Sequence, residues 1–225
     1  MIYVPIVHTV ADMGSQAEAL EREHVRRHGR AEWARTRRLI DEVWEAIRVR
    51  LAALELDPSR VRIYQDGLPV CGREAEIVRD VAAKGSKNYA LILALFDRGA
   101  TVEGTESPAL LREEYEGIRM IGEARSELEA RQAREAYARE TVRILRERDA
   151  FVVRRIDETL KDGEVGILFL GLMHEVDRLL PEDIAVQYLI PRLPLHLSSS
   201  PAPKISTAKT QRTPRPEEEK RPEKG

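Results

Sequence analysis

The stretch Val165-Gly-Ile-Leu-Phe-Leu-Gly-Leu-Met-His174 decides the fold class, because a nearly all-apolar run leads directly into a histidine. Consecutive apolar residues are typical of a strand that is covered on both faces, as in a parallel sheet. Asp162-Gly163 stops the helix that precedes the run. The sequence therefore predicts a buried strand over residues 165–170, followed by a short helical segment up to Pro181.

Extended and helical patterns alternate on both sides of this strand. Four further strands are expected at Ile2–Val7, Val61–Tyr64, Ala100–Val102 and Ile184–Ile190. Apolar residues at spacings of three and four predict helices over 15–54, interrupted near Gly29, and over 122–160. Pro5 indicates that the first strand is an edge strand or has one unpaired position. The alternation predicts an α/β fold with a mostly parallel sheet of about five strands, flanked by long helices.

Composition suggests one folded domain with a tail. Apolar residues make up 42% of the 225 residues and charged residues 34%, which is enough apolar material for one core. Residues 1–194 are expected to form a single α/β domain. Residues 195–225 are rich in Pro, Ser, Lys and Glu, so we expect a disordered tail, and a solvated tail is favoured over one that binds a partner.

Charge and hydropathy exclude several classes of protein. The 37 basic and 39 acidic residues leave a formal charge of −2, which disfavours binding to nucleic acid or to a membrane surface. No apolar run approaches the roughly 20 residues of a membrane span, and the first residues do not resemble a secretory signal, so a cytoplasmic location is expected. Cys71 is the only cysteine, which excludes an intrachain disulfide and a multi-cysteine zinc site.

Polar residues follow four of the predicted strands. These residues are His8, Asp66, Glu106 and His174. Ligands of parallel α/β sheets bind at the carboxyl ends of the strands, so we expect the four side chains to meet at one rim. Two imidazoles and one or two carboxylates are suitable ligands for Zn, Mn or Fe and leave an open position for water. The same set could also perform acid/base chemistry without a metal, or the residues could simply cap helices and face solvent.

The long helix over 122–160 carries one further candidate pair. Asp149 fills a gap in the apolar stripe, four residues after Leu145 and three before Val152, so we expect it on the buried face. A buried carboxylate requires a partner, and Arg148 could turn toward the same place. The alternative is a kink or an ion pair at the surface edge. His24 and His28 have a spacing that suits a metal, but their arginine-rich surroundings favour a solvated face.

These motifs resemble the superfamily of TraB/Tiki, ChaN-like and erythromycin-esterase-like proteins. The resemblance covers Arg148-Asp149 up to Leu160, the strand end Gly171-Leu-Met-His174 and the following Arg178-Leu-Leu180. His8 is similar to a histidine after the family's first strand, although Pro5 stands where the family has glycine, and Asp66 matches an acid after the second strand. The resemblance implies a site with two histidines and an acid, used in some members for metal-dependent or ester hydrolysis and in others for metal or haem binding.

The leading hypothesis is a hydrolase, metal-assisted or not. His8, His174, Asp66 and Glu106 would be ligands or bases, and Arg148 would stabilise an anion or a transition state. Asp149 is a further candidate catalytic residue. The alternative is a non-catalytic module that senses a small polar ligand or a metal and forms a homodimer through its long helices. A purely structural scaffold explains the helices but not the residues at the strand ends.

Overall fold

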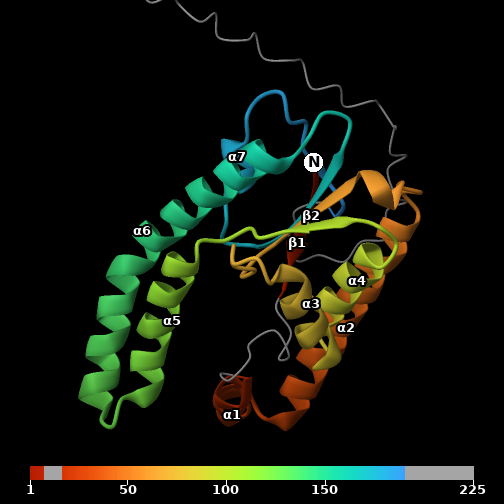
Figure 1. Ribbon diagram of the computed structural model, residues 1–225. Helices are drawn as coiled ribbons and strands as arrows, with labels where there is room; N and C mark the ends of the chain where they lie inside the picture. The colour runs from red at the N-terminus through yellow and green to blue at the C-terminus, as the bar shows by residue number, and fades with distance from the viewer. Residues whose placement is uncertain (8–16, 191–225) are drawn as a thin grey trace, which may run out of the picture.

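The structure is a computed structural model that describes residues 1–7 and 17–190. Its centre is a parallel sheet in the order β3-β2-β4-β1-β5, which confirms the predicted α/β fold (Figure 1). The strands are β1 (Ile2–Ile6), β2 (Val61–Gln65), β3 (Thr101–Glu103), β4 (Val165–Gly171) and β5 (Gln187–Tyr188). The helices are α1 (Ala17–His28), α2 (Arg30–Ala52), α3 (Glu74–Ala83), α4 (Lys87–Phe96), α5 (Pro108–Glu123), α6 (Glu127–Thr159) and α7 (Val176–Leu179), with a 3-10 turn at Pro58–Arg60.

Strand β4 lies at the centre of the sheet, between β2 and β1. Its residues pair in parallel with both neighbours, so that Ile167 is opposite Ile63 of β2 and Ile2 of β1. Residues 166–170 are buried without interruption. This burial on both faces explains why the strand is apolar at consecutive positions.

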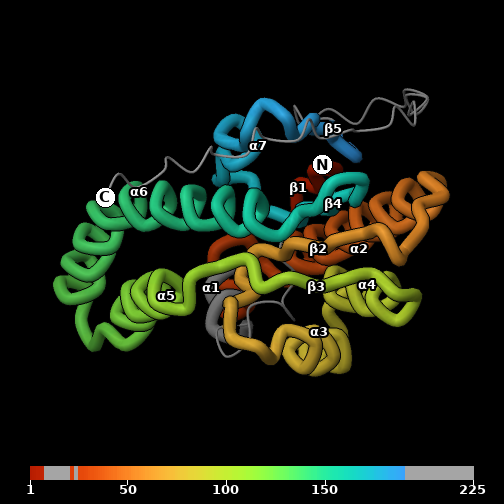
Figure 2. Tube along the Cα trace, turned by 45° about the horizontal axis from the view of Figure 1, so that its top comes forward, coloured from red at the N-terminus to blue at the C-terminus, as the bar shows by residue number. Residues whose placement is uncertain are grey.

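The two faces of the sheet have separate apolar cores. Ile167 and Phe169 belong to the core under α2, α3 and α4, whereas Leu168 and Leu170 belong to the core under α6 and α7. Figure 2 shows α6 and α7 on one side of the strands and α3 and α4 on the other. Because both faces are covered, the polar groups of the sheet can be reached mainly at its edges and at the strand ends.

Serine side chains begin three of the helices. Ser86, Ser107 and Ser126 each accept a hydrogen bond from the backbone N–H three residues further on, at the start of α4, α5 and α6. Gly29, with φ 87°, interrupts the first helical segment between α1 and α2, as the sequence predicts.

Helices α5 and α6 form an antiparallel hairpin that extends away from the sheet (Figure 1). The helices approach closely at Gly117, where an added Cβ would lie 2.6 Å from Cδ2 of Tyr137. Only the second half of α6 has fully buried residues, which begin at Ile144. The site described below lies where this half of α6 crosses the sheet.

Of the two positions that Pro5 allows, the structure has the second: β1 lies between β4 and β5 rather than at the edge, and Pro5 is unpaired on one side. Tyr3 directs its carbonyl to β5, where it accepts a hydrogen bond from the N–H of Leu189. Pro5 is two residues further and directs its backbone to the same side. Strand β5 is much shorter than predicted and pairs only with Ile2 and Tyr3, so it ends before Pro5. Because β5 does not reach Pro5, the N–H that proline lacks removes no hydrogen bond between these two strands.

Two parts of the sequence-based prediction fall outside the described residues. These are His8, which follows the last described residue of the first segment, and the predicted tail 195–225. Within residues 1–7 and 17–190, no helix has both the length and the apolar composition of a membrane span.

Candidate functional site

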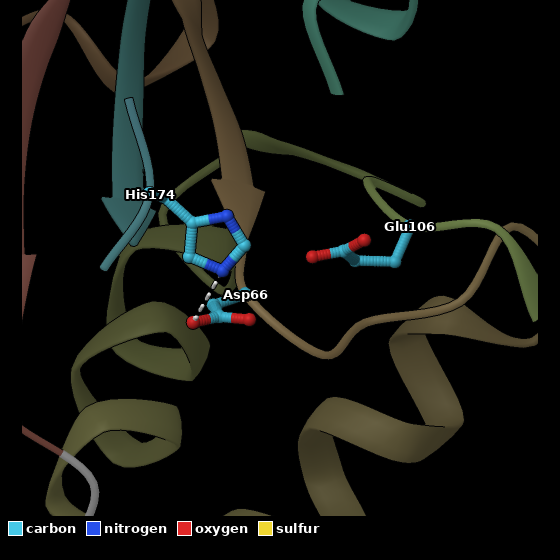
Figure 3. A group of neighbouring side chains, drawn as sticks. All are labelled: Asp66, Glu106 and His174. Carbon is cyan, nitrogen blue, oxygen red and sulfur yellow. Dashed lines mark ion pairs between the residues drawn. The ribbon is translucent and has the colours of Figure 1, made fainter. Parts of the chain in front are cut away.

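Three of the four predicted strand-end residues meet at the carboxyl edge of the sheet. Asp66, Glu106 and His174 each offer a ligand atom, and these atoms all lie within 4.8 Å of one another. Figure 3 shows the imidazole of His174 and the carboxylate of Glu106 converging on Asp66. All three residues are buried, and Glu106 has no exposed surface. The predicted convergence is therefore present for the residues that the structure describes.

Backbone hydrogen bonds fix the positions of Asp66 and Glu106. The N–H of Asp66 donates to the carbonyl of Phe169, and Oδ2 of Asp66 accepts from the N–H of Gly171 at 3.0 Å, so Asp66 is held by β4. The N–H of Glu106 donates to the carbonyl of Leu68 at 3.0 Å. The loop after β2 is thus hydrogen-bonded to the loop after β3, and the main chain holds the backbone of both acidic residues and the carboxylate of Asp66.

Arg148 joins the two carboxylates from α6. Its Nη2 donates to Oδ1 of Asp66 at 2.7 Å and to Oε1 of Glu106 at 2.8 Å, and its Nε donates to Oε2 of Glu106 at 3.2 Å. Its Nη1 donates to Oε2 of Glu114 on α5 at 2.7 Å. Every one of these acceptors is a carboxylate of the protein, so Arg148 serves here as a counter-ion, and an anionic ligand would have to displace one of them.

Asp149 orients the histidine. Its Oδ1 lies 2.5 Å from Nδ1 of His174, and its Oδ2 accepts from the N–H of Glu175 at 2.9 Å. An ionised carboxylate only accepts hydrogen bonds, so the proton of a neutral His174 resides on Nδ1. Nε2 is then an acceptor, and it lies 3.7 Å from Oδ2 of Asp66. Asp149 is on the buried face of α6, as predicted, and its partner is His174.

The site contains more negative than positive groups. Three carboxylates (Asp66, Glu106 and Glu114) bind the guanidinium of Arg148, and a fourth, that of Asp149, binds His174. Burial raises the pKa of Glu106 above its ordinary value of 4.5, although the hydrogen bonds from Arg148 act in the opposite direction. Burial alone would lower the pKa of Arg148, but its bonds to Glu106 and its other acidic neighbours raise it. This balance favours an additional cation, either a proton or a metal ion.

The sequence did not predict the roles of three contributors to the site, namely Glu114, Gln65 and Asn88. Glu114 lies on α5 among several other glutamates, and only the packing of α5 against α6 distinguishes it. Gln65 donates from Nε2 to the carbonyl of Asp66, and its Oε1 accepts from Nδ2 of Asn88 at 2.9 Å. Both amides are fully buried and support the turn that carries Asp66.

His8 is a candidate whose side chain the structure does not describe. The residue before it, Val7, accepts a hydrogen bond at its carbonyl from Nε1 of Trp44 at 3.3 Å. Ile6 pairs with Gly171, whose N–H binds Asp66. His28 is exposed at the end of α1, apart from this cluster, and the side chain of His24 also lies outside the description.

The fold and the site define an α/β protein with a buried cluster of carboxylates, arginine and histidine at the carboxyl ends of its strands. Comparisons with protein-family models, with curated proteins and with solved structures found no match to this chain. The resemblance to the TraB/Tiki, ChaN-like and erythromycin-esterase-like superfamily therefore stays a prediction.

Proposed function

We propose that the protein is a hydrolase assisted by a divalent metal ion, which Asp66, Glu106 and His174 hold. His8 is the candidate for a fourth ligand. The observation that carries this proposal is the hydrogen bond between Asp149 and Nδ1 of His174. Histidines that bind metals usually donate their other ring N–H to a carboxylate, which fixes the ring and leaves the second nitrogen free to coordinate.

The chemistry of the donor set fits such an ion. One imidazole nitrogen and two carboxylates suit Zn, Mn or Fe, and the excess of carboxylates over Arg148 favours a cation. Arg148 already bonds both carboxylates, so the ion would compete with it or share the remaining lone pairs of Asp66 and Glu106. We therefore expect weaker binding than at a site without a resident guanidinium.

Each residue has a defined task in this proposal. The ion would supply Lewis-acid polarisation of a substrate oxygen and activation of water. Asp149 holds His174 in one tautomer, and Arg148 keeps Asp66 and Glu106 in fixed positions. The surplus of carboxylates repels an anionic substrate, so a neutral ester is a better substrate than a phosphate ester.

The first test is metal binding by the purified protein. Zn, Mn and Fe contents are measured after exposure to each metal and dialysis, for the native chain and for His8→Ala, His174→Ala and Asp66→Asn. The control is His28→Ala, which removes an exposed histidine. Near-stoichiometric metal that is lost in His174→Ala and Asp66→Asn but kept in His28→Ala supports the proposal. Absence of metal in the native chain contradicts it.

The second test is hydrolysis by the metal-loaded protein. Turnover of p-nitrophenyl acetate and p-nitrophenyl phosphate is compared between the native chain and His174→Ala. We expect metal-dependent turnover of the neutral ester, abolished in the variant. Hydrolysis that is equal in the two proteins would show that the site is not responsible.

The burial of the cluster supports a second candidate, a module that binds a metal or a small polar ligand without catalysis. Glu106 is fully buried and every carboxylate of the cluster already has a hydrogen-bond donor. Stoichiometric metal without turnover of any ester would favour this module over the hydrolase.

A further inference from the structure

A separate cavity of about 440 Å³ lies under α2 and α4, on the other side of the sheet from α6. Val61 at the start of β2 and Ile167 of β4 are among its lining residues. The candidate site lies instead at the carboxyl ends of the strands. Cavities that bind small ligands commonly have volumes of about 300–1,000 Å³, so this one is large enough for a ligand.

Small side chains on α4 leave this space open. Ala90 and Ala94 both line the cavity, one helical turn apart on the same face of α4, and Trp44 and Leu51 line it from α2. A larger residue at either alanine would fill part of the space. The lining of α2 from Trp44 to Ala52 spans about 12 Å at a rise of about 1.5 Å per residue, which suits an extended apolar chain.

Charged side chains form the exposed rim, and one cation has no ion pair. Arg48 pairs with Glu45, and Lys87 pairs with Asp41. Arg98, at the end of α4, has no ion pair with any residue in the described part of the chain.

Glu55 is the second acid on the rim and is also without an ion pair among the described residues. Asp41 neutralises Lys87 and Glu45 neutralises Arg48, so Arg98 and Glu55 are the two rim charges that have no ion pair among the described residues. A guanidinium can bind a carboxylate through two parallel hydrogen bonds, which is a stronger contact than that of a ligand ammonium group with Glu55, so a ligand carboxylate at Arg98 is favoured.

We propose that this cavity binds an amphipathic carboxylate, with its apolar chain between α2 and α4 and its carboxylate at Arg98. The apolar chain covers Val61 and Ile167, and a charge-assisted hydrogen bond to the guanidinium holds the head group. This site does not depend on the proposed hydrolase, because it shares no residue with the cluster at the carboxyl edge.

Trp44 provides a direct reporter of binding, because it lines the cavity and the chain has only one other tryptophan, Trp33. In a Trp33→Phe background, decanoate is titrated below its micelle concentration while the fluorescence of Trp44 is recorded. We expect a saturable change, and calorimetry with the same ligand measures binding without relying on fluorescence. No saturable binding by either method overturns the proposal.

Filling the cavity tests its location. Ala94→Leu should weaken decanoate binding by about tenfold or more, equivalent to about 1.4 kcal/mol. The matched control is Ala138→Leu, which adds the same side chain to an exposed position on α6. Circular dichroism checks that both variants fold. Equal affinity of the two folded variants would place the ligand elsewhere and refute the proposed site.

The carboxylate is tested with ligands of the same chain length and with a surface variant that leaves the core unchanged. Decanoate should bind more tightly than decanol or decylamine, and Arg98→Gln should weaken decanoate by about twofold to fivefold, as expected for an exposed charge pair. The control Arg139→Gln removes an exposed arginine of α6 and should have no effect. Equal binding of the three ligands, or tighter binding of the amine, contradicts the proposed head group.

Discussion

Replacing Arg148 with methionine should strongly destabilise the protein, because it leaves two buried carboxylates without their counter-ion. Arg148 donates three hydrogen bonds to Asp66 and Glu106 and one to Glu114, and its side chain is only 7% exposed. Removing one partner of a buried ion pair costs about 3–5 kcal/mol, because the other charge stays buried and unpaired. With a urea slope of about 2 kcal/mol per molar, the unfolding midpoint at neutral pH should fall by about 2 M.

Two controls separate this effect from a general loss of an arginine. Arg119→Met removes an exposed arginine that pairs with Glu116 and Glu123, and it should leave the urea midpoint unchanged. Adding Asp66→Asn and Glu106→Gln to Arg148→Met removes the unpaired charges and should recover part of the loss. A loss of less than about 1 kcal/mol in Arg148→Met would mean that water or protons already neutralise the carboxylates, and it would refute the reasoning.

Three further predictions follow from the same structure. Burial raises the pKa of Glu106 in the folded protein above 4.5. The protonated side chain therefore stabilises the fold below pH 4.5, and this contribution is lost as the pH rises through the folded pKa. Glu106→Gln should flatten this fall in the free energy of unfolding, which is measured by urea titrations from about pH 4 to 8. Asp149→Asn should weaken metal binding at His174 by about 10–100-fold in equilibrium dialysis, and an unchanged affinity would exclude an orienting role. Gly117→Val should lower the free energy of unfolding by about 1–3 kcal/mol in urea titrations, because its Cβ would clash with Tyr137; an equal or higher stability would contradict the close packing of α5 and α6.

The central part of the fold could be predicted from local patterns, because burial on both faces leaves a clear mark on the sequence. Residues 165–170 are apolar at consecutive positions, and they form most of β4 at the centre of the sheet. The ends of the sheet were harder to predict. Strand β5 consists of two residues where seven were expected, since its length depends on how far it follows β1 and not on its own apolar pattern. The same length decides which alternative applies at Pro5, because β5 ends before it and leaves its position on β1 unpaired.

The candidate site was predictable where a residue breaks a regular pattern. Asp149 interrupts an apolar stripe, and Asp66 and His174 follow strands, so their burial together could be expected from the sequence. Glu114 breaks no pattern, because α5 is rich in exposed glutamates and their burial is decided only by the neighbouring helix. The pairing of Asp149 with His174 was likewise outside the sequence patterns, since it depends on the angle at which α6 crosses the sheet.

The adjacent residues Arg148 and Asp149 explain why α6 must cross the sheet at the ends of β2 and β4. Successive residues of a helix point about 100° apart, so the two side chains cannot share one partner. Arg148 reaches the carboxylates that follow β2 and β3, whereas Asp149 reaches His174 beyond β4. Further along α6, Val152 and Ile156 pack against the apolar core on this face of the sheet. A rotation or a shift of α6 would therefore separate both pairs at once, which couples the packing of this helix to the charge balance and to the orientation of the histidine.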